Sequence, residues 1–355
     1  MVEEHLMIRE TREGPQAIKK TVEENKEVVE SLIREIKEKR VTKGFIIGSG
    51  TSFHASVTLN FLLTKFTSLH FTAIPASEFE DWTPIEASDY AIIAFSQSGE
   101  SSDIIKAVEV AREKGVFVIG ITNTPGSTLT KLSNFALVTR AGEEKAVTAT
   151  KTYDAQLAIS SYLAYSLSET PKAKDLLGKL ETIPAIVQKV IDYEDKIREI
   201  AEKYKKAENV FVLGRGVNYA NALETGLKLK EAAMIHAEGF AVREFLHGPV
   251  QLVGENTPVV IHVPTVSSLE QSEKTINKLK SYNAKIIAIA GESVKVDDFA
   301  TDVIRIPDVE EELSIFPVIK AAQLFAYYIS IARGLNPDKP TKLTKVVKYE
   351  GEEGQ

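Results

Sequence analysis

The sequence has no cysteine among its 355 residues. This absence excludes disulfide bonds, cysteine-ligated zinc, iron–sulfur clusters and catalysis by a thiol nucleophile. It fits a cytoplasmic protein, which is the location we expect. The segment 1–15 is charged and has no apolar signal core, and no apolar run comes near the ~18 residues that a membrane helix needs. We therefore expect no membrane partner.

An excess of basic residues is also missing, because 50 acidic residues outnumber 43 basic ones and give a net charge of −7. Nucleic-acid-binding proteins need a basic face to neutralise phosphates, so we expect no nucleic-acid partner. A small anionic substrate needs only a local site and stays possible. The length fits two domains of about 150 residues each.

Short β-branched runs alternate with longer helical patterns, which indicates a parallel sheet with strands buried on both faces. In the first half the predicted strands are 44–47, 71–74, 90–95, 116–121 and 135–138, and the predicted helices are 17–39, 103–114 and 153–167. In the second half the predicted strands are 209–213, 259–263, 285–290 and 302–306, and the predicted helices are 176–205 and 221–234.

The second half repeats the first, 166 residues later. The matching stretches are Gly48-Ser49-Gly50 with Gly214-Arg215-Gly216, Glu78-Phe79 with Glu244-Phe245, and Ala136-Leu137-Val138 with Asp302-Val303-Ile304. Three matches in one register indicate a duplicated domain. The sequence therefore predicts two tandem, doubly wound, flavodoxin-like α/β domains. The predicted parts are an N-terminal segment 1–27, a first domain 28–170, a second domain 171–335 and a C-terminal tail 336–355.

A serine-rich segment follows a predicted strand and precedes a predicted helix. It reads Ser96-Gln97-Ser98-Gly99-Glu100-Ser101-Ser102. Ligands of open parallel sheets bind beyond the carboxyl ends of the strands. Hydroxyls, a glycine and the free amides of a helix N-terminus make a phosphate cradle that needs no lysine. The alternative is a turn in which Ser101 or Ser102 only caps the helix, but four serines exceed what capping requires.

A second strand–helix junction reads Gly48-Ser49-Gly50-Thr51-Ser52. The dinucleotide pattern GxGxxG fails here because position 53 is Phe, and it fails at the repeat because position 219 is Tyr. We therefore expect no dinucleotide cofactor. The hydroxyls of Thr51 and Ser52 fit a phosphate or sugar contact, and a simple tight turn is the alternative.

The predicted helix 221–234 carries Glu224, Lys228 and Glu231 on one stripe. Taken alone, such a stripe is typical of a solvated salt-bridge face. The helix starts just after a strand end, however, so a carboxylate flanked by a lysine there is a candidate general base.

Two histidines follow this helix. His247 stands beside Gly-Pro, which predicts a loop, and histidine is a natural acid–base group near neutral pH. For His236 we expect a hydrogen-bonded packing residue. The spacing of these histidines and the nearby glutamates matches no standard set of metal ligands, so no metal site is expected.

Together these segments resemble the sugar isomerase (SIS) family. They are similar to the isomerase half of glucosamine-6-phosphate synthases and to stand-alone glucosamine-6-phosphate deaminases. The stretches that carry the resemblance are GSGTS (48–52), ASEFE (76–80), SQSGES (96–101), TNTPGSTL (122–129), ATKTY (149–153), residues 213–240, EFLHGP (244–249) and LTKVV (343–347). The synthases also carry a glutaminase domain with a cysteine nucleophile, which this sequence lacks. Other departures are Ser49, Ala149 and Arg243, which stand where Cys, Ser and a small residue are common.

The resemblance implies a role for each matching residue. The implied phosphate ligands are Ser52, Ser96, Gln97, Ser98 and Ser101. The implied sugar-site residues are Thr51, Val147 and Glu224, and Lys228 would orient the site together with Glu224. Glu231 would move a proton between C1 and C2, and Lys345 would form a Schiff base with the open-chain ketose. His247 would open the sugar ring from the neighbouring subunit, which implies a homodimer.

The implied activity is the interconversion of glucosamine 6-phosphate and fructose 6-phosphate plus ammonia, without metal or cofactor. An amine, a carboxylate and an acid–base group suffice for this chemistry. One alternative is an isomerase subunit supplied with ammonia by a separate glutaminase. Another is an isomerase or deglycase acting on a different phosphorylated sugar. A sensor that binds a sugar phosphate without turnover is the non-enzymatic alternative.

Overall fold

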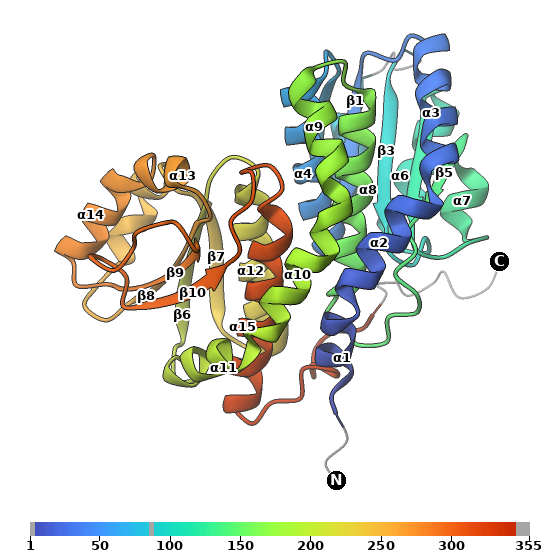
Figure 1. The fold of residues 1–355 in the computed structure, drawn as a ribbon. Helices are drawn as coiled ribbons and strands as arrows, with labels where there is room; N and C mark the ends of the chain where they lie inside the picture. Colours follow the sequence, from blue (N-terminus) through green and yellow to red (C-terminus); the bar gives the residue numbers. More distant parts are fainter. Residues whose placement is uncertain (1–3, 85–88, 346–355) are drawn as a thin grey trace. The chain divides into compact units, whose positions relative to one another are not determined.

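The computed structural model describes residues 4–84 and 89–345, and the chain divides into two compact units (Figure 1). Unit A consists of Gln16–Glu144, Lys151–Glu181 and, among the described tail residues, 344–345. Unit B consists of residues 4–15, Lys145–Thr150 and Thr182–Leu343. The rest of the predicted tail, 346–355, lies outside the described residues.

Unit A is built on a five-stranded parallel sheet with the order β2-β1-β3-β4-β5. Its strands are β1 (Lys43–Gly48), β2 (His70–Pro75), β3 (Ala91–Ser96), β4 (Phe117–Thr122) and β5 (Phe135–Val138). Every residue of the central strand β3 is buried, as expected for a strand covered on both faces.

Helices cover both faces of this sheet. The long helices α4 (Thr51–Phe66) and α8 (Lys151–Leu167) pack on one face, and α6 (Ser102–Glu113) and α7 (Thr128–Leu132) pack on the other (Figure 1). The remaining elements of this part of the chain are α2 (Gly14–Glu24), α3 (Lys26–Glu38), η1 (Ala76–Glu78), α5 (Phe79–Trp82), α9 (Pro171–Lys179) and η2 (Leu180–Thr182).

Unit B has the same design, with the strand order β10-β9-β8-β6-β7, all parallel. Its strands are β6 (Asn209–Gly214), β7 (His236–Ala241), β8 (Pro258–Val263), β9 (Lys285–Gly291) and β10 (Asp302–Ile306). One face is covered by α10 (Ile183–Asp192), α11 (Glu194–Lys203), α12 (Asn218–Ala233) and α15 (Ile315–Ala332). The other carries α13 (Val266–Glu270) and α14 (Glu273–Ser281), and α1 (Leu6–Arg12) packs on α15.

The two sheets confirm the predicted doubly wound α/β class and its duplication. Read from β1 and from β6, the strand orders are identical. The repeated Glu-Phe pairs also correspond, since Glu78 ends η1 after β2 and Glu244 begins η3 (Glu244–Leu246) after β7. All nine predicted strands are present within a residue or two of their predicted bounds.

Two predicted helices were wrong, and strand β7 and helices α14 (Glu273–Ser281) and α15 (Ile315–Ala332) were not predicted. The predicted helix 17–39 is two helices, because Asn25 leaves helical geometry and its amide donates to the carbonyls of Thr21 and Val138. The predicted helix 176–205 is broken into α9, α10 and α11, and Pro184 near the start of α10 has no N–H to continue a helix. Strand β7 was missed, because His, Glu and Gly interrupt the apolar residues of its sequence HAEGFA.

Helix α15 corrects the expectation that no segment is long and apolar enough to span a membrane. By length and mean hydropathy its 18 residues pass that test, but 89% of the segment is buried inside the structure. The charge that it carries is also hydrogen-bonded there, since Lys320 Nζ donates to Gln323 Oε1 and to the carbonyl of Thr11, each at 2.7 Å. Such a helix is typical of the core of an α/β unit.

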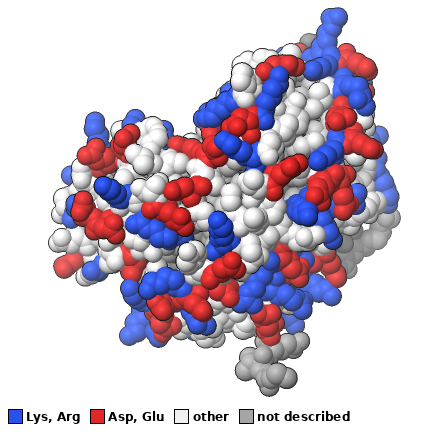
Figure 2. Space-filling model, in the orientation of Figure 1, with Lys and Arg blue, Asp and Glu red and all other residues white. Residues whose placement is uncertain are grey.

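On the face shown in Figure 2, acidic and basic side chains are interspersed, with no large patch of one sign.

Burial of His262 predicts a loss of stability in acid. His262 lies in β8 without solvent exposure, and desolvation lowers its pKa to about 4. In the unfolded chain this imidazole has a pKa of about 6.5. As the pH falls from 6.5 toward 4, His262 therefore binds a proton in the unfolded chain but stays neutral in the folded chain. This side chain should therefore cost stability of about 3 kcal/mol between pH 7 and pH 4.

Denaturant unfolding at a series of pH values tests this. His262→Leu should show a shallower fall in unfolding free energy below pH 6.5 than the wild type. His236→Leu, at an exposed position on β7, should keep the wild-type slope. Equal slopes for wild type and His262→Leu would contradict the prediction.

Candidate functional site

The serine turn, residues 96–102, leads from β3 into α6 in unit A. Its internal hydrogen bonds use backbone donors: the Gly99 N–H donates to Ser96 Oγ at 3.0 Å, and the Glu100 N–H donates to Ser98 Oγ at 3.1 Å. A hydroxyl oxygen that accepts in this way keeps its own proton for another acceptor. The turn is therefore arranged so that Ser96 and Ser98 can each donate to an anion.

The start of α6 adds further donors. Ser101 holds the N-cap position, but its side chain makes no capping hydrogen bond, so capping does not account for it. The N–H groups at the start of a helix and the helix dipole both favour a negative charge at this point. The acidic residue of the turn is engaged elsewhere, because the Glu100 carboxylate accepts the Thr128 N–H at 2.8 Å. The Gln97 carbonyl accepts the Asn123 N–H at 3.1 Å, which ties the turn to the end of β4.

The second strand–helix junction combines a tight turn with a hydroxyl. A Cβ on Gly48 would lie 2.4 Å from the backbone of Ser52, so glycine permits a close approach of strand end and helix start. Gly50, with φ of 54°, precedes Thr51, the first residue of α4. Ser52 is 8% exposed, and its Oγ accepts from Gln156 Nε2 at 2.9 Å. The proton of Ser52 is thus also available to a ligand.

These two junctions share one edge of the sheet. Strand β1 pairs directly with β3, and the chain continues from β1 to β2 on one side and from β3 to β4 on the other. Such a reversal is the topological switch point, where open α/β sheets bind their ligands. The residues predicted to hold phosphate therefore lie at the position in unit A where a ligand is expected.

The tail lysine belongs to the same unit. Lys345 Nζ is 2.6 Å from Glu144 Oε2, and the Glu144 side chain has no solvent exposure. Glu144 also accepts from Thr152, at 3.1 Å from the backbone N–H and 2.7 Å from the hydroxyl. Sequence reasoning found Lys345 by resemblance but missed Glu144, Thr152 and Gln156. No local pattern marks these three residues, since their contacts lie far apart in the chain or depend on the packing of α8.

In unit B, helix α12 gathers the predicted carboxylates around a lysine. Lys228 Nζ is 3.2 Å from Glu224 Oε1 and 2.5 Å from Glu231 Oε2. Glu224 and Lys228 have no exposed side-chain surface, whereas Glu231 is 19% exposed. The stripe is therefore buried, and the solvated salt-bridge interpretation is wrong.

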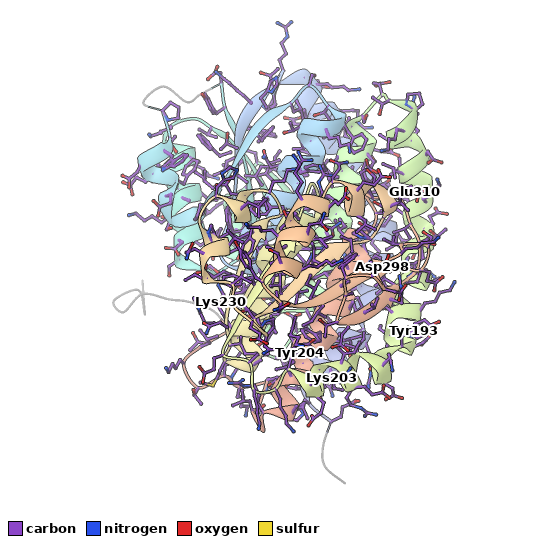
Figure 3. All side chains as sticks on the ribbon, turned by 90° about the vertical axis from the view of Figure 1, so that its left-hand side faces the viewer. Tyr193, Lys203, Tyr204, Lys230, Asp298 and Glu310 are labelled. Carbon is purple, nitrogen blue, oxygen red and sulfur yellow. The ribbon has the colours of Figure 1, made fainter. Side chains whose placement is uncertain are left out.

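Burial disfavours the ammonium form of Lys228, but the charges of Glu224 and Glu231 outweigh it and raise the pKa of Lys228. Lys228 thus stays charged and orients both carboxylates. Of the two, Glu231 alone has exposed side-chain surface. Lys230 is exposed on the same helix and lies at the surface in Figure 3.

Two other predicted residues lie elsewhere in unit B. His247 occupies the predicted loop, between η3 and η4 (Pro249–Leu252), and is exposed. Val147 is partly buried in the segment 145–150, and its N–H donates to the Asp338 carbonyl at 3.2 Å. Within the described residues, no hydrogen bond joins either of them to the α12 cluster.

The metal-site alternative finds no support in the described part of the chain, where no three His, Asp or Glu side chains are grouped to hold an ion. His236 Nδ1 lies 3.0 Å from Asn209 Oδ1, and its Nε2 lies 3.5 Å from Glu238 Oε1. The hydrogen bond expected of His236 is confirmed, but a packing role is wrong, because 66% of its side chain is exposed.

Two repeats of one doubly wound sheet, each a five-stranded parallel α/β unit, define a tandem α/β protein. The SIS domain model matches the chain twice, at residues 36–166 and 203–333. The chain therefore belongs to the SIS domain family and carries two copies of the domain.

Similar proteins include two glutamine–fructose-6-phosphate aminotransferases [isomerizing]. The protein from Pyrococcus horikoshii is 37% identical over 354 residues, and that from Aquifex aeolicus is 36% identical over 350 residues. In both cases the match covers 98% of this chain and 58% of the relative. The chain thus spans a little over half the length of these relatives.

Solved structures share the fold. The C-terminal domain of glucosamine-fructose-6-phosphate aminotransferase from Francisella tularensis matches with a TM-score of 0.85 and 28% identity, covering 94% of this chain and 97% of that one. A glucosamine-6-phosphate deaminase from Thermotoga maritima matches with a TM-score of 0.72 and 24% identity, covering 96% and 99%. At that identity, the second match shows the fold alone.

The α12 cluster predicts a large effect of Lys228 on stability. Lys228→Gln removes the ammonium and leaves two carboxylates close together, one of them fully buried, which should lower the unfolding free energy by about 3–5 kcal/mol. Lys230→Gln, two residues further along the same helix but exposed, should stay within about 0.5 kcal/mol of the wild type. Denaturant unfolding measures both. A loss below about 1 kcal/mol for Lys228→Gln would show that the cluster does not depend on this charge.

Proposed function

We propose that the protein is a phosphosugar isomerase that interconverts glucosamine 6-phosphate and fructose 6-phosphate plus ammonia. The observation that carries this proposal is the set of serine hydroxyls at the switch point of unit A. Ser52, Ser96 and Ser98 each accept an internal hydrogen bond on oxygen and so present a proton to a ligand. Together with the N-terminus of α6, this arrangement suits a phosphate monoester.

A phosphate handle would leave the reacting carbons free. Its binding energy can orient the sugar although the phosphate does not react. The SIS membership and the named relatives, several of which are isomerizing aminotransferases of fructose 6-phosphate, support a hexose 6-phosphate as the substrate.

The chemistry balances without metal or redox cofactor. Ring opening gives glucosamine 6-phosphate an aldehyde at C1. Moving the C2 proton to C1, together with an N–H proton to the C1 oxygen, converts the C2 amine into an imine and the C1 aldehyde into a CH2OH group. Water then turns this imine into the ketone of fructose 6-phosphate and releases ammonia. If Lys345 first takes the place of ammonia at C2, the same water later frees the sugar from the lysine.

The proposed roles follow the predicted ones. Glu231 would carry the proton between C2 and C1, held by Lys228, with Glu224 completing the cluster. His247 would assist ring opening, and Lys345 would form the imine. The contacts of Thr51, Gln97, Ser101 and Val147 with the substrate remain predictions.

Ammonia would enter or leave as the free molecule. The 355 residues contain no cysteine, so they offer no thiol to hydrolyse glutamine. The assay is incubation with glucosamine 6-phosphate, measuring ammonia and fructose 6-phosphate, beside a second incubation with fructose 6-phosphate and either ammonium or glutamine. Turnover with ammonium but not glutamine is expected. Tight binding of both sugars without any turnover would favour a sensor.

Glu231→Gln should abolish turnover and preserve substrate binding, because an amide cannot accept and return the proton. A rate loss of at least about 10²-fold is expected. Ammonia release measures turnover, and calorimetry with fructose 6-phosphate measures binding. Glu255→Gln, an exposed position on a loop of unit B, serves as the matched control and should behave as wild type. Full activity in Glu231→Gln would refute the assigned base.

We further propose a cytoplasmic homodimer. The exposure of His247 on a loop supports this, because the family resemblance assigns the ring-opening histidine to the neighbouring subunit. Light scattering of the purified protein should give twice the monomer mass of 39.1 kDa. A monomer that is fully active would exclude a borrowed histidine.

A further inference from the structure

Glu144 is a buried carboxylate with a fixed orientation. Its Oε1 accepts from the Thr152 N–H at 3.1 Å, and its Oε2 accepts from the Thr152 hydroxyl at 2.7 Å. Thr152 is the second residue of α8, so its N–H is one of the donors that a helix leaves free at its start. The helix dipole also favours a carboxylate there. Both carboxylate oxygens are therefore set by α8 itself.

Lys345 has no such support from its own backbone. Residues 341–345 form neither helix nor strand. A lysine side chain is a flexible stem that ends in a compact charge, so contacts at its tip determine where the amine lies. The contact with Glu144 Oε2, at 2.6 Å, joins this amine to the oriented carboxylate.

We propose that Glu144 is a positioning residue for Lys345. It would hold the amine at a fixed point relative to α8, ready to form an imine with C2 of the substrate. This inference rests on the proposed function, which makes Lys345 the imine-forming amine. Glu144 itself touches no reacting atom in this scheme and acts through the lysine.

Helix α8 contacts both Glu144 and Ser52 through its side chains. Thr152 and Gln156 are four residues apart, so they lie on one face of α8, about 6 Å apart along its axis. Thr152 orients Glu144, and thereby Lys345, while Gln156 Nε2 donates to Ser52 Oγ. One rigid helix thus supports both the amine and a predicted phosphate ligand. The two functions can be lost separately, because they depend on different side chains of α8.

The test is reductive trapping. With fructose 6-phosphate and cyanoborohydride, the imine between Lys345 and C2 is reduced by hydride to a stable secondary amine, and peptide mass spectrometry locates the adduct. Glu144→Gln keeps the size and the acceptor oxygen but removes the charge. At saturating sugar, we expect its trapping rate to fall by about 10- to 100-fold, as expected for a misplaced reacting group. Its affinity for inorganic phosphate, measured by calorimetry, should stay within about twofold of wild type, because the serine turns are intact.

Three comparisons sharpen the result. Glu143→Gln changes the neighbouring, exposed acid and should trap at the wild-type rate. Thr152→Val keeps the charge of Glu144 but removes the hydroxyl that orients it, and should lower the rate by a smaller factor. It also serves as the second variant if Glu144→Gln folds poorly. Gln156→Leu should weaken phosphate binding while sparing the trapping rate at saturation.

The outcomes separate the two proposals. Wild-type trapping rates in both Glu144→Gln and Thr152→Val would overturn the positioning role and leave the proposed function standing. A parallel loss of phosphate affinity in Glu144→Gln would also overturn it, because Glu144 would then be a structural residue of unit A. No adduct at Lys345 in the wild type would instead refute the proposed role of the lysine.

Discussion

The candidate site in unit A depends on one constraint: the chain leaves two neighbouring strands in opposite directions. Strands β1 and β3 are paired, yet the chain leaves them toward opposite sides of the sheet, through helices that cover opposite faces. The two helices cannot both fill the space at the shared edge, so backbone amides and short side chains meet there. Serine and glycine suit this position because they bring donors close to a ligand without filling the space themselves.

The duplicated topology carries different side chains at corresponding positions of the two units. In unit A, the junctions after β1 and β3 present hydroxyls and amides that are neutral. In unit B, the helix after β6 instead carries Glu224, Lys228 and Glu231 in and near the core. Burial explains this use: the ammonium is held by two carboxylates, and each carboxylate is oriented by the ammonium. A common scaffold thus positions candidate phosphate-binding groups in one unit and candidate proton-transfer groups in the other.

Sequence alone predicted the strands well and the polar contacts poorly. Runs such as AIIAFS at β3 identify a buried strand because every side chain is apolar or small, whereas β7 escaped because HAEGFA has no such run. The break at Asn25 depends on the carbonyl of Val138, more than a hundred residues away. Likewise the contact of Glu144 with Lys345 joins residues about two hundred positions apart. The burial of Lys228 cannot be inferred from helical spacing. Tertiary contacts of this kind leave no periodic trace in the sequence.

The composition of the two strand–helix junctions, 48–52 and 96–102, determines how phosphate binding there would respond to ionic strength. Neither 48–52 nor 96–102 contains a lysine or arginine, so these segments would hold a phosphate through short-range dipoles and not through fixed positive charges. Dissolved ions screen charges over about 10 Å at moderate salt but weaken a direct hydrogen bond little. Recognition by such a surface is therefore suited to a concentrated electrolyte, where a cluster of lysines would lose much of its attraction.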